Sequence, residues 1–156
     1  AQGGGLQHIV AAKAICFEEA LKPAFKNYII NVLNNTTICA EELGRLGAVV
    51  SDTNNHLFLL DTLKSYGLTG LEAQLKLEEI GITTNKNMIP GDKLKPNETS
   101  GLRIGFAALT TRGCDGRTAN EIAQLIHRYL KNEIFKNDVM TNIRKIAHKL
   151  KKIQNI

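Results

Sequence analysis

The sequence lacks the features that mark a membrane, secreted or disulfide-stabilised protein. No apolar run reaches the roughly 18 residues that a membrane-spanning helix requires, and no signal peptide with its charged, apolar and small-residue regions is present. The cysteines Cys16, Cys39 and Cys114 are odd in number, lie far apart and form no CxxC pair. We therefore expect a cytoplasmic protein with buried, unpaired thiols, with an exposed position in the stretch RGCDG as the alternative for Cys114.

The chain also lacks a recognisable catalytic apparatus. Its four histidines show no spacing typical of metal ligands, and no Ser-His-Asp or Cys-His arrangement can be argued from their positions. His127 lies in an amphipathic segment, where we expect it at the boundary of the core. The sequence therefore predicts no metal site and assigns no catalytic residue within these 156 residues.

Excess positive charge is missing everywhere except at the C-terminal end. The formal net charge is +5, but residues 1–130 hold 13 Lys and Arg against 13 Asp and Glu, whereas residues 131–156 hold 7 against 2. A basic terminal helix without interleaved aromatic residues is typical of a solvated surface, so we expect neither nucleic acid nor a membrane as a partner. The alternative is a binding module that holds an acidic partner or nucleic acid through this helix.

What the sequence does contain is the pattern of one α+β domain. Its 43% hydrophobic residues suffice for an ordinary core. Helical spacing of apolar residues covers 6–21, 23–46 and 135–153, and two capping-box pairs, Thr69 with Glu72 and Thr118 with Glu121, open further helices. Strand-like runs cover 48–51, 56–60, 82–84 and 101–106. We expect a small, mainly antiparallel sheet with helices on one face, residues 1–46 forming a helical arm and 47–156 the remainder.

One arginine stands out in the stretch TSGLRIGFAALTTRG, which covers residues 99–113. In a strand, Leu102 and Ile104 would share one face, while Arg103 would share the other with Gly101 and Gly105. A guanidinium with cleared flanks can bind a carboxylate through two parallel hydrogen bonds. An ion pair with an acidic side chain of the same domain is an equally good interpretation of this spacing.

Two further motifs allow a ligand but do not require one. The glycines of QGGGL precede a helix, where backbone N–H groups suit a phosphate, although a frayed terminus explains them as well. In TTNKN, Asn85 and Asn87 could recognise a heterocycle through paired donors and acceptors, although turn chemistry accounts for the same residues. Lys86 has neither the apolar surroundings nor the cationic neighbour that would suit it for covalent chemistry.

Several stretches together resemble one family. QGGGLQHIVAAKA, FEEALKPAFKNYIINV, DTNNHLFLLD, LTGLEAQLKLEEIGITTNKNMIP and TSGLRIGFAALTTRG occur in the order found in the C-terminal portion of serine hydroxymethyltransferase, a pyridoxal-phosphate enzyme of fold type I. The likeness runs from Gln2 to about Leu130 and covers about the last third of the family's protein. It implies an aminotransferase-like small domain, cut from a longer chain.

The resemblance also implies a function. The family transfers a one-carbon unit between serine and tetrahydrofolate, giving glycine and methylene-tetrahydrofolate. By this likeness Arg103 holds the amino-acid carboxylate and Arg112 supports it, while Asn87 contacts the folate pterin. Gly3 and Gly4 match positions that approach the cofactor phosphate of the partner subunit in a homodimer.

Other family features are missing or altered. The lysine that carries the cofactor, the residue stacked on its ring and the acid facing its nitrogen are implied to lie upstream, so we expect this segment alone to be inactive. Gly5 replaces a proline, which should loosen the helix entrance, and the residues KPN at 95–97 replace Ser-Pro-Phe in a loop near the folate. A threonine aldolase of the same fold type is the nearer alternative, and the NKN motif favours folate.

Overall fold

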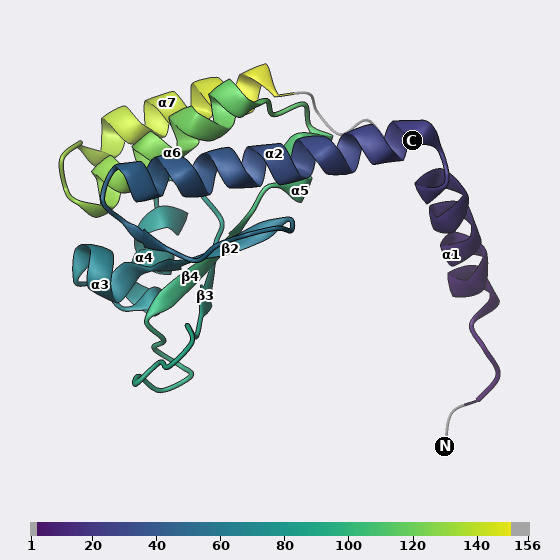
Figure 1. Ribbon diagram of the computed structural model, residues 1–156, viewed down its shortest axis with the longest axis horizontal. Coiled ribbons are helices and arrows are strands. Elements are labelled where there is room, and N and C mark those ends of the chain that lie inside the picture. Colours follow the sequence, from purple (N-terminus) through teal and green to yellow (C-terminus); the bar gives the residue numbers. More distant parts are fainter. Residues whose placement is uncertain (1–2, 151–156) are drawn as a thin grey trace.

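The computed structural model describes residues 3–150 and shows the α+β architecture that the sequence predicts. Its centre is a four-stranded sheet in the order β1-β2-β4-β3, in which every neighbouring pair is antiparallel. The strands are β1 (Val49–Val50), β2 (Leu57–Asp61), β3 (Asn85–Asn87) and β4 (Gly101–Gly105). Helices pack against one face of this sheet (Figure 1).

The two faces of the sheet differ because side chains alternate along each strand. Phe58 and Leu60 of β2 and Leu102 and Ile104 of β4 are buried against helices. The covering helices are α2 (Pro23–Arg45), α4 (Gly70–Glu78) and α6 (Gly116–Leu130), and α7 (Lys136–Lys149) packs on α6. The opposite face carries Arg103 and is not covered by any of these helices. We call it the open face.

The two helices predicted for residues 6–46 are present, but the first of them does not join the core. Helix α1 (Gln7–Ala20) is followed by a bend at Leu21 and by Pro23, which occupies the first turn of α2. Every residue of α1 is exposed, and the helix projects away from the sheet (Figure 1). The arm is buried only from Val32 onward, where α2 meets the core.

The two predicted capping boxes have different outcomes. At α4 the Thr69 side chain accepts a hydrogen bond from the backbone N–H of Glu72, whose carboxylate accepts one from the Thr69 N–H, so this box is confirmed. The prediction for Thr118 is wrong, because Asp115 caps α6 and accepts from the Thr118 N–H at 2.8 Å. An aspartate three residues earlier supplies a stronger acceptor, and the helix begins at Gly116.

The strand expected at 82–84 is also displaced, and the reason is the end of α4. Gly81 adopts φ 84°, and the Ile82 N–H bonds to the Leu77 carbonyl, which closes the helix with a left-handed glycine. The chain becomes extended only afterwards, so β3 is formed by the NKN motif itself. The short helices α3 (Thr62–Tyr66) and α5 (Ala107–Thr111) are too brief for apolar periodicity to predict them.

Several single-residue expectations need correction. Cys39 and Cys114 are buried as free thiols, whereas Cys16 is exposed because all of α1 is exposed. His127 is not a boundary residue: it is 4% exposed, and its Nδ1 lies 3.1 Å from the Tyr66 hydroxyl. In the last helix the stripe at Val139, Ile146 and Leu150 is buried, and Phe135 is exposed. The predicted end of that helix, at Ile153, lies outside the described residues.

No helix within residues 3–150 is long and apolar enough to cross a bilayer. Across the same part of the chain, His, Cys, Asp and Glu residues form no group of three or more that could hold a metal ion.

Candidate functional site: an arginine on the open face of the sheet

The central feature of the open face is the Arg103 side chain. Strand β4 lies between β2 and β3, and the register places Leu59 on one side of Arg103 and Asn85 on the other. Its neighbours Leu102 and Ile104 are buried on the helical face, whereas Arg103 is exposed. Alternation along a paired central strand therefore aims the guanidinium away from the core, on a backbone that is hydrogen-bonded from both sides.

Arg103 has no acidic partner in the described part of the chain. The ion pairs within residues 3–150 join Arg45 to Glu42, Lys64 to Asp61 and Lys136 to Glu79. No hydrogen bond between described residues uses the Arg103 side chain, and the alternative of an internal ion pair is therefore not realised. The guanidinium keeps its hydrogen-bond donors for water or for a ligand.

The two glycines beside Arg103 turn out to serve different purposes. A Cβ at Gly101 would lie 2.6 Å from Cγ2 of Ile89 and 2.9 Å from the Leu60 carbonyl, so packed hydrocarbon occupies this flank. The expectation of open space there is wrong. On the other side, a hollow of about 330 Å³ is lined by Leu57, Arg103, Gly105 and three further residues, His56, Ala107 and Ala108. Free volume therefore adjoins the guanidinium on the Gly105 side and not at Gly101.

Asn87 lies on the same open face as Arg103. It pairs with Gly101 across β3 and β4, two residues along from the Asn85–Arg103 pair, so the two predicted ligand-binding side chains are diagonal neighbours on one surface. The Asn87 Nδ2 donates to the Met88 carbonyl at 2.6 Å. This bond fixes the orientation of the amide and still leaves a second N–H and the amide oxygen. The Lys86 backbone N–H is held by the Gln74 side chain at 2.8 Å.

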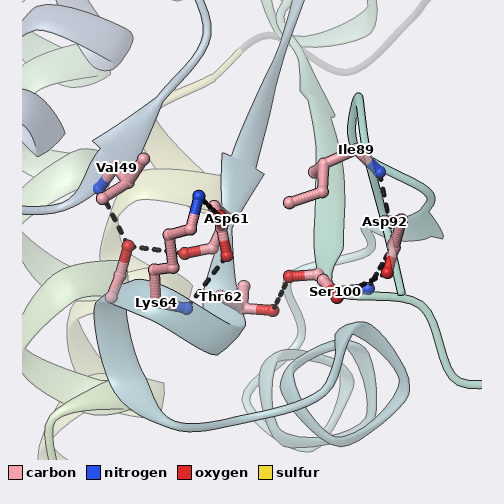
Figure 2. Close-up of polar contacts among 8 residues, drawn as sticks. Val49, Asp61, Thr62, Lys64, Ile89, Asp92 and Ser100 are labelled. Atoms are coloured by element: carbon pink, nitrogen blue, oxygen red, sulfur yellow. Dashed lines mark hydrogen bonds and ion pairs between the residues drawn. The ribbon is translucent and has the colours of Figure 1, made fainter. Parts of the chain in front are cut away.

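Sequence reasoning did not identify the residue that organises the loop at the edge of this face. Asp92 accepts four hydrogen bonds, from the backbone N–H groups of Ile89, Leu94 and Ser100 and from the Ser100 hydroxyl, and Figure 2 shows the bonds to Ile89 and Ser100. The Ser100 hydroxyl, followed by the backbone donors, lowers the pKa of the Asp92 carboxyl to about 2. The available signal was the stretch Pro-Gly-Asp at 90–92, which is typical of a tight turn.

Arg112 lies behind the sheet rather than beside Arg103. It caps the end of α5, is half-buried and donates to the Ala147 carbonyl of α7 at 3.0 Å. It borders an apolar cavity of about 300 Å³ between α5, α6 and α7. Gly105 and Ala108 line this cavity and also the hollow beside Arg103. The two arginines therefore flank the same junction between β4 and α5 from different sides.

Gly3 and Gly4 are not brought near the other predicted site residues. Both are exposed, and a Cβ at either would meet no atom within 4 Å. They precede α1, and Figure 1 shows that this end of the chain lies far from the sheet. Within this chain they therefore belong to a separate surface.

Taken together, the fold and the site define an α+β domain that presents an exposed arginine on an open antiparallel sheet. The family model described as serine hydroxymethyltransferase matches residues 1–126. The chain belongs to the serine hydroxymethyltransferase family, whose members are pyridoxal-phosphate transferases of one-carbon metabolism. The match includes β4 and the open face, ends within α6 and leaves α7 outside it.

Proposed function

We propose that this chain is the C-terminal small domain of an enzyme that transfers a one-carbon unit between serine and tetrahydrofolate, and that it supplies the carboxylate-binding side of that enzyme's site. The observation that carries the proposal is the exposed Arg103, which has no acidic partner among residues 3–150 and lies in a segment matched by the family model. A small domain with this geometry binds substrate without performing the chemical step itself.

Arg103 would hold the amino-acid carboxylate through two parallel N–H···O bonds. The planar guanidinium fixes both the position and the orientation of a carboxylate, and hydrogen bonds to charged groups contribute about 1.5–3 kcal/mol each. No internal acid competes for these donors within the described residues. The hollow beside Gly105 provides space for the remainder of a small amino acid such as serine or glycine.

Asn87 would contact the pterin of tetrahydrofolate from the same face. Its amide is oriented by the bond to the Met88 carbonyl and retains a donor and an acceptor for a heterocycle. Arg112 would support the site at a distance, because its bond to the Ala147 carbonyl ties the segment after β4 to α7.

Pyridoxal phosphate, when bound, supplies the electron sink for reactions at the amino-acid Cα. The residues of this chain fit only part of its binding site. Gly3 and Gly4 have open space for a close approach and lie ahead of a helix N-terminus, which suits a phosphate. Their distance from Arg103 supports the proposal that they serve the site of a second subunit in a homodimer.

The exposed arm supports the same arrangement. Val10 and Phe17 within α1, and Leu6 and Leu21 at its two ends, are each more than half exposed, at 56%, 66%, 64% and 86%. Apolar surface of this extent is typical of a segment that packs against further protein. We propose that the arm is covered in the homodimer.

We further propose that the isolated 156-residue chain is inactive, because the resemblance implies that the family's cofactor-carrying lysine lies upstream of these residues. Mixing the chain with pyridoxal phosphate and serine tests this proposal by absorbance. The expected result is the spectrum of free cofactor and no serine cleavage. A stable band of lysine-bound cofactor together with cleavage would contradict it.

The proposed reaction is tested in the full-length protein. We expect tetrahydrofolate-dependent exchange between serine and glycine, which Arg103→Ala should reduce for every amino-acid substrate. Folate-independent cleavage of threonine without tetrahydrofolate-dependent exchange would instead identify a threonine aldolase. We place the enzyme in the cytoplasm, where free thiols such as the three found here remain reduced.

A further inference from the structure

The loop over residues 88–100 connects the two halves of the proposed site. It leaves β3 after Asn87 and enters β4 at Gly101, so it links the proposed folate contact to the strand that carries Arg103. This loop is ordered around one carboxylate, that of Asp92.

The first part of the loop is a tight turn that depends on Asp92. In residues 89–92 (IPGD) the Asp92 N–H donates to the Ile89 carbonyl at 3.0 Å, and Gly91 adopts φ 74°. Proline at the second position and a left-handed glycine at the third are the signature of a type II turn. The turn brings the Asp92 carboxylate back to the Ile89 N–H, which it accepts at 3.3 Å.

The second part of the loop anchors Asp92 to the sheet. One carboxylate oxygen accepts from the Ser100 N–H at 2.8 Å, and the other accepts from the Ser100 hydroxyl at 2.6 Å. The Ser100 carbonyl in turn accepts from the N–H groups of Thr62 and Leu63 and from the Thr62 hydroxyl at 3.0–3.1 Å. Figure 2 shows this chain of contacts from Ile89 through Asp92 and Ser100 to Thr62.

The consequence reaches Asn87 through Ile89. The Ile89 side chain packs over Gly101, the register partner of Asn87, so fixing Ile89 fixes the end of β3 against β4. Arg103 depends on this loop much less, because the β2–β4 ladder holds its strand along residues 101–105. The clamp made by Asp92 and Ser100 therefore acts on one half of the site.

We propose that Asp92 is a positioning residue for folate binding, which sets the place of Asn87 by clamping Ile89 to Ser100 and leaves the amino-acid carboxylate site unaffected. The inference rests on the proposed function. It assigns to Asp92 a role in one substrate's affinity, whereas a merely structural residue would affect both substrates alike.

The test uses the full-length protein carrying Asp92→Asn. The substituted amide keeps the volume but cannot accept on both sides, so at least one of the four donors loses its partner. We expect the KM for tetrahydrofolate to rise roughly tenfold, the effect of losing a charge-assisted hydrogen bond. Glycine affinity and folate-independent cleavage of a β-hydroxy amino acid should stay within about twofold.

The matched control is Asp138→Asn, at an exposed position in the first turn of α7. It should change neither the KM for tetrahydrofolate nor the affinity for glycine.

Ser100→Ala provides a second, milder variant that removes only the hydroxyl donor. It should raise the KM for tetrahydrofolate by a smaller factor and likewise leave glycine affinity unchanged. If Asp92→Asn does not fold, Ser100→Ala provides the test. An unchanged KM for tetrahydrofolate, or equal losses of folate and glycine affinity, would overturn this inference while leaving the proposed function intact. Absence of tetrahydrofolate-dependent exchange in the unmodified protein would overturn both.

Discussion

Glycine at position 101 is required by contact rather than by backbone conformation. The register places it opposite Asp61 on β2 and Asn87 on β3, and the Ile89 side chain and the Leu60 carbonyl lie so close that a side chain there has no room. In the sequence alone, the glycines around Arg103 suggest space for a ligand. That interpretation fails at Gly101 because Ile89, twelve residues earlier, was not recognisable as its neighbour.

We expect Gly101→Ala to lower the free energy of unfolding by about 1–3 kcal/mol, the usual cost of forcing extra volume into a packed position. Urea denaturation of the chain measures it. The matched control is Gly44→Ala on an exposed face of α2, where the new Cβ would lie 3.6 Å from Val50 Cγ2 in ordinary contact. That control should be stabilising by about 0.5–1 kcal/mol, since alanine favours a helix interior. Similar effects of the two substitutions would contradict the packing argument.

At the level of secondary-structure elements, local chemistry predicts helix starts only where one candidate cap is present. At α4 the Thr69–Glu72 pair has no competitor and was found from the sequence. At α6 the sequence offers Asp115 and Thr118, and the spacing to Glu121 favoured the wrong one. The strand β3 was missed for a related reason, since polar residues give no alternation and the pairing of Lys86 with Leu102 is a tertiary contact.

The assignment of the α6 cap makes a prediction about two acidic residues. Asp115→Ala should lower the free energy of unfolding by about 1 kcal/mol through loss of the bond to the Thr118 N–H. Glu121→Ala, at an exposed helical position, should change it by less than about 0.5 kcal/mol. Thermal denaturation of both variants distinguishes the two caps, and the reverse order would restore the capping box at Thr118.

The Asp115 effect should also depend on pH. The bond from Thr118 lowers the pKa of the Asp115 carboxyl, so the folded state binds its proton less readily than the unfolded state. The stabilisation is therefore present above the unfolded pKa of about 4 and is lost as the pH falls through the folded value. The difference in the free energy of unfolding between the unmodified chain and Asp115→Ala should therefore be smaller in acid than at neutral pH. A difference that does not change with pH would contradict this account.

Across the whole molecule, the sequence predicts the layers better than it predicts the surroundings of individual groups. Alternation in β4 and the helical spacing in α2, α6 and α7 give the α+β architecture and the side of the sheet on which Arg103 lies. Burial of His127 could not be predicted, because it depends on the contact of α6 with Tyr66, far away in the sequence. The exposure of α1 was missed because its apolar residues resemble those of a core helix.

Global stability should fall in mild acid because of His127. Burial, with Lys131 nearby, lowers the pKa of the imidazole below its ordinary value of 6.5. The unfolded chain then binds the proton at a higher pH than the folded chain. The contribution of His127 to the free energy of unfolding is therefore fully present above about pH 6.5 and declines below it. Urea midpoints between pH 8 and 5 should show the decline, and His127→Gln should flatten it. The exposed His148→Gln should leave the slope as it is; a slope independent of His127 would contradict the account.

The most direct test of the central claim is the affinity of the full-length holoenzyme for glycine with Arg103→Lys. Lysine keeps the positive charge but cannot form the two parallel bonds, and among residues 3–150 no ion pair involves the Arg103 side chain. We predict that Arg103→Lys weakens glycine binding by at least about tenfold, the equivalent of about 1.4 kcal/mol. The unfolding midpoint should not change. Arg144→Lys on α7 is the control and should leave glycine affinity as it is. Unaltered glycine affinity in Arg103→Lys would show that the carboxylate binds elsewhere.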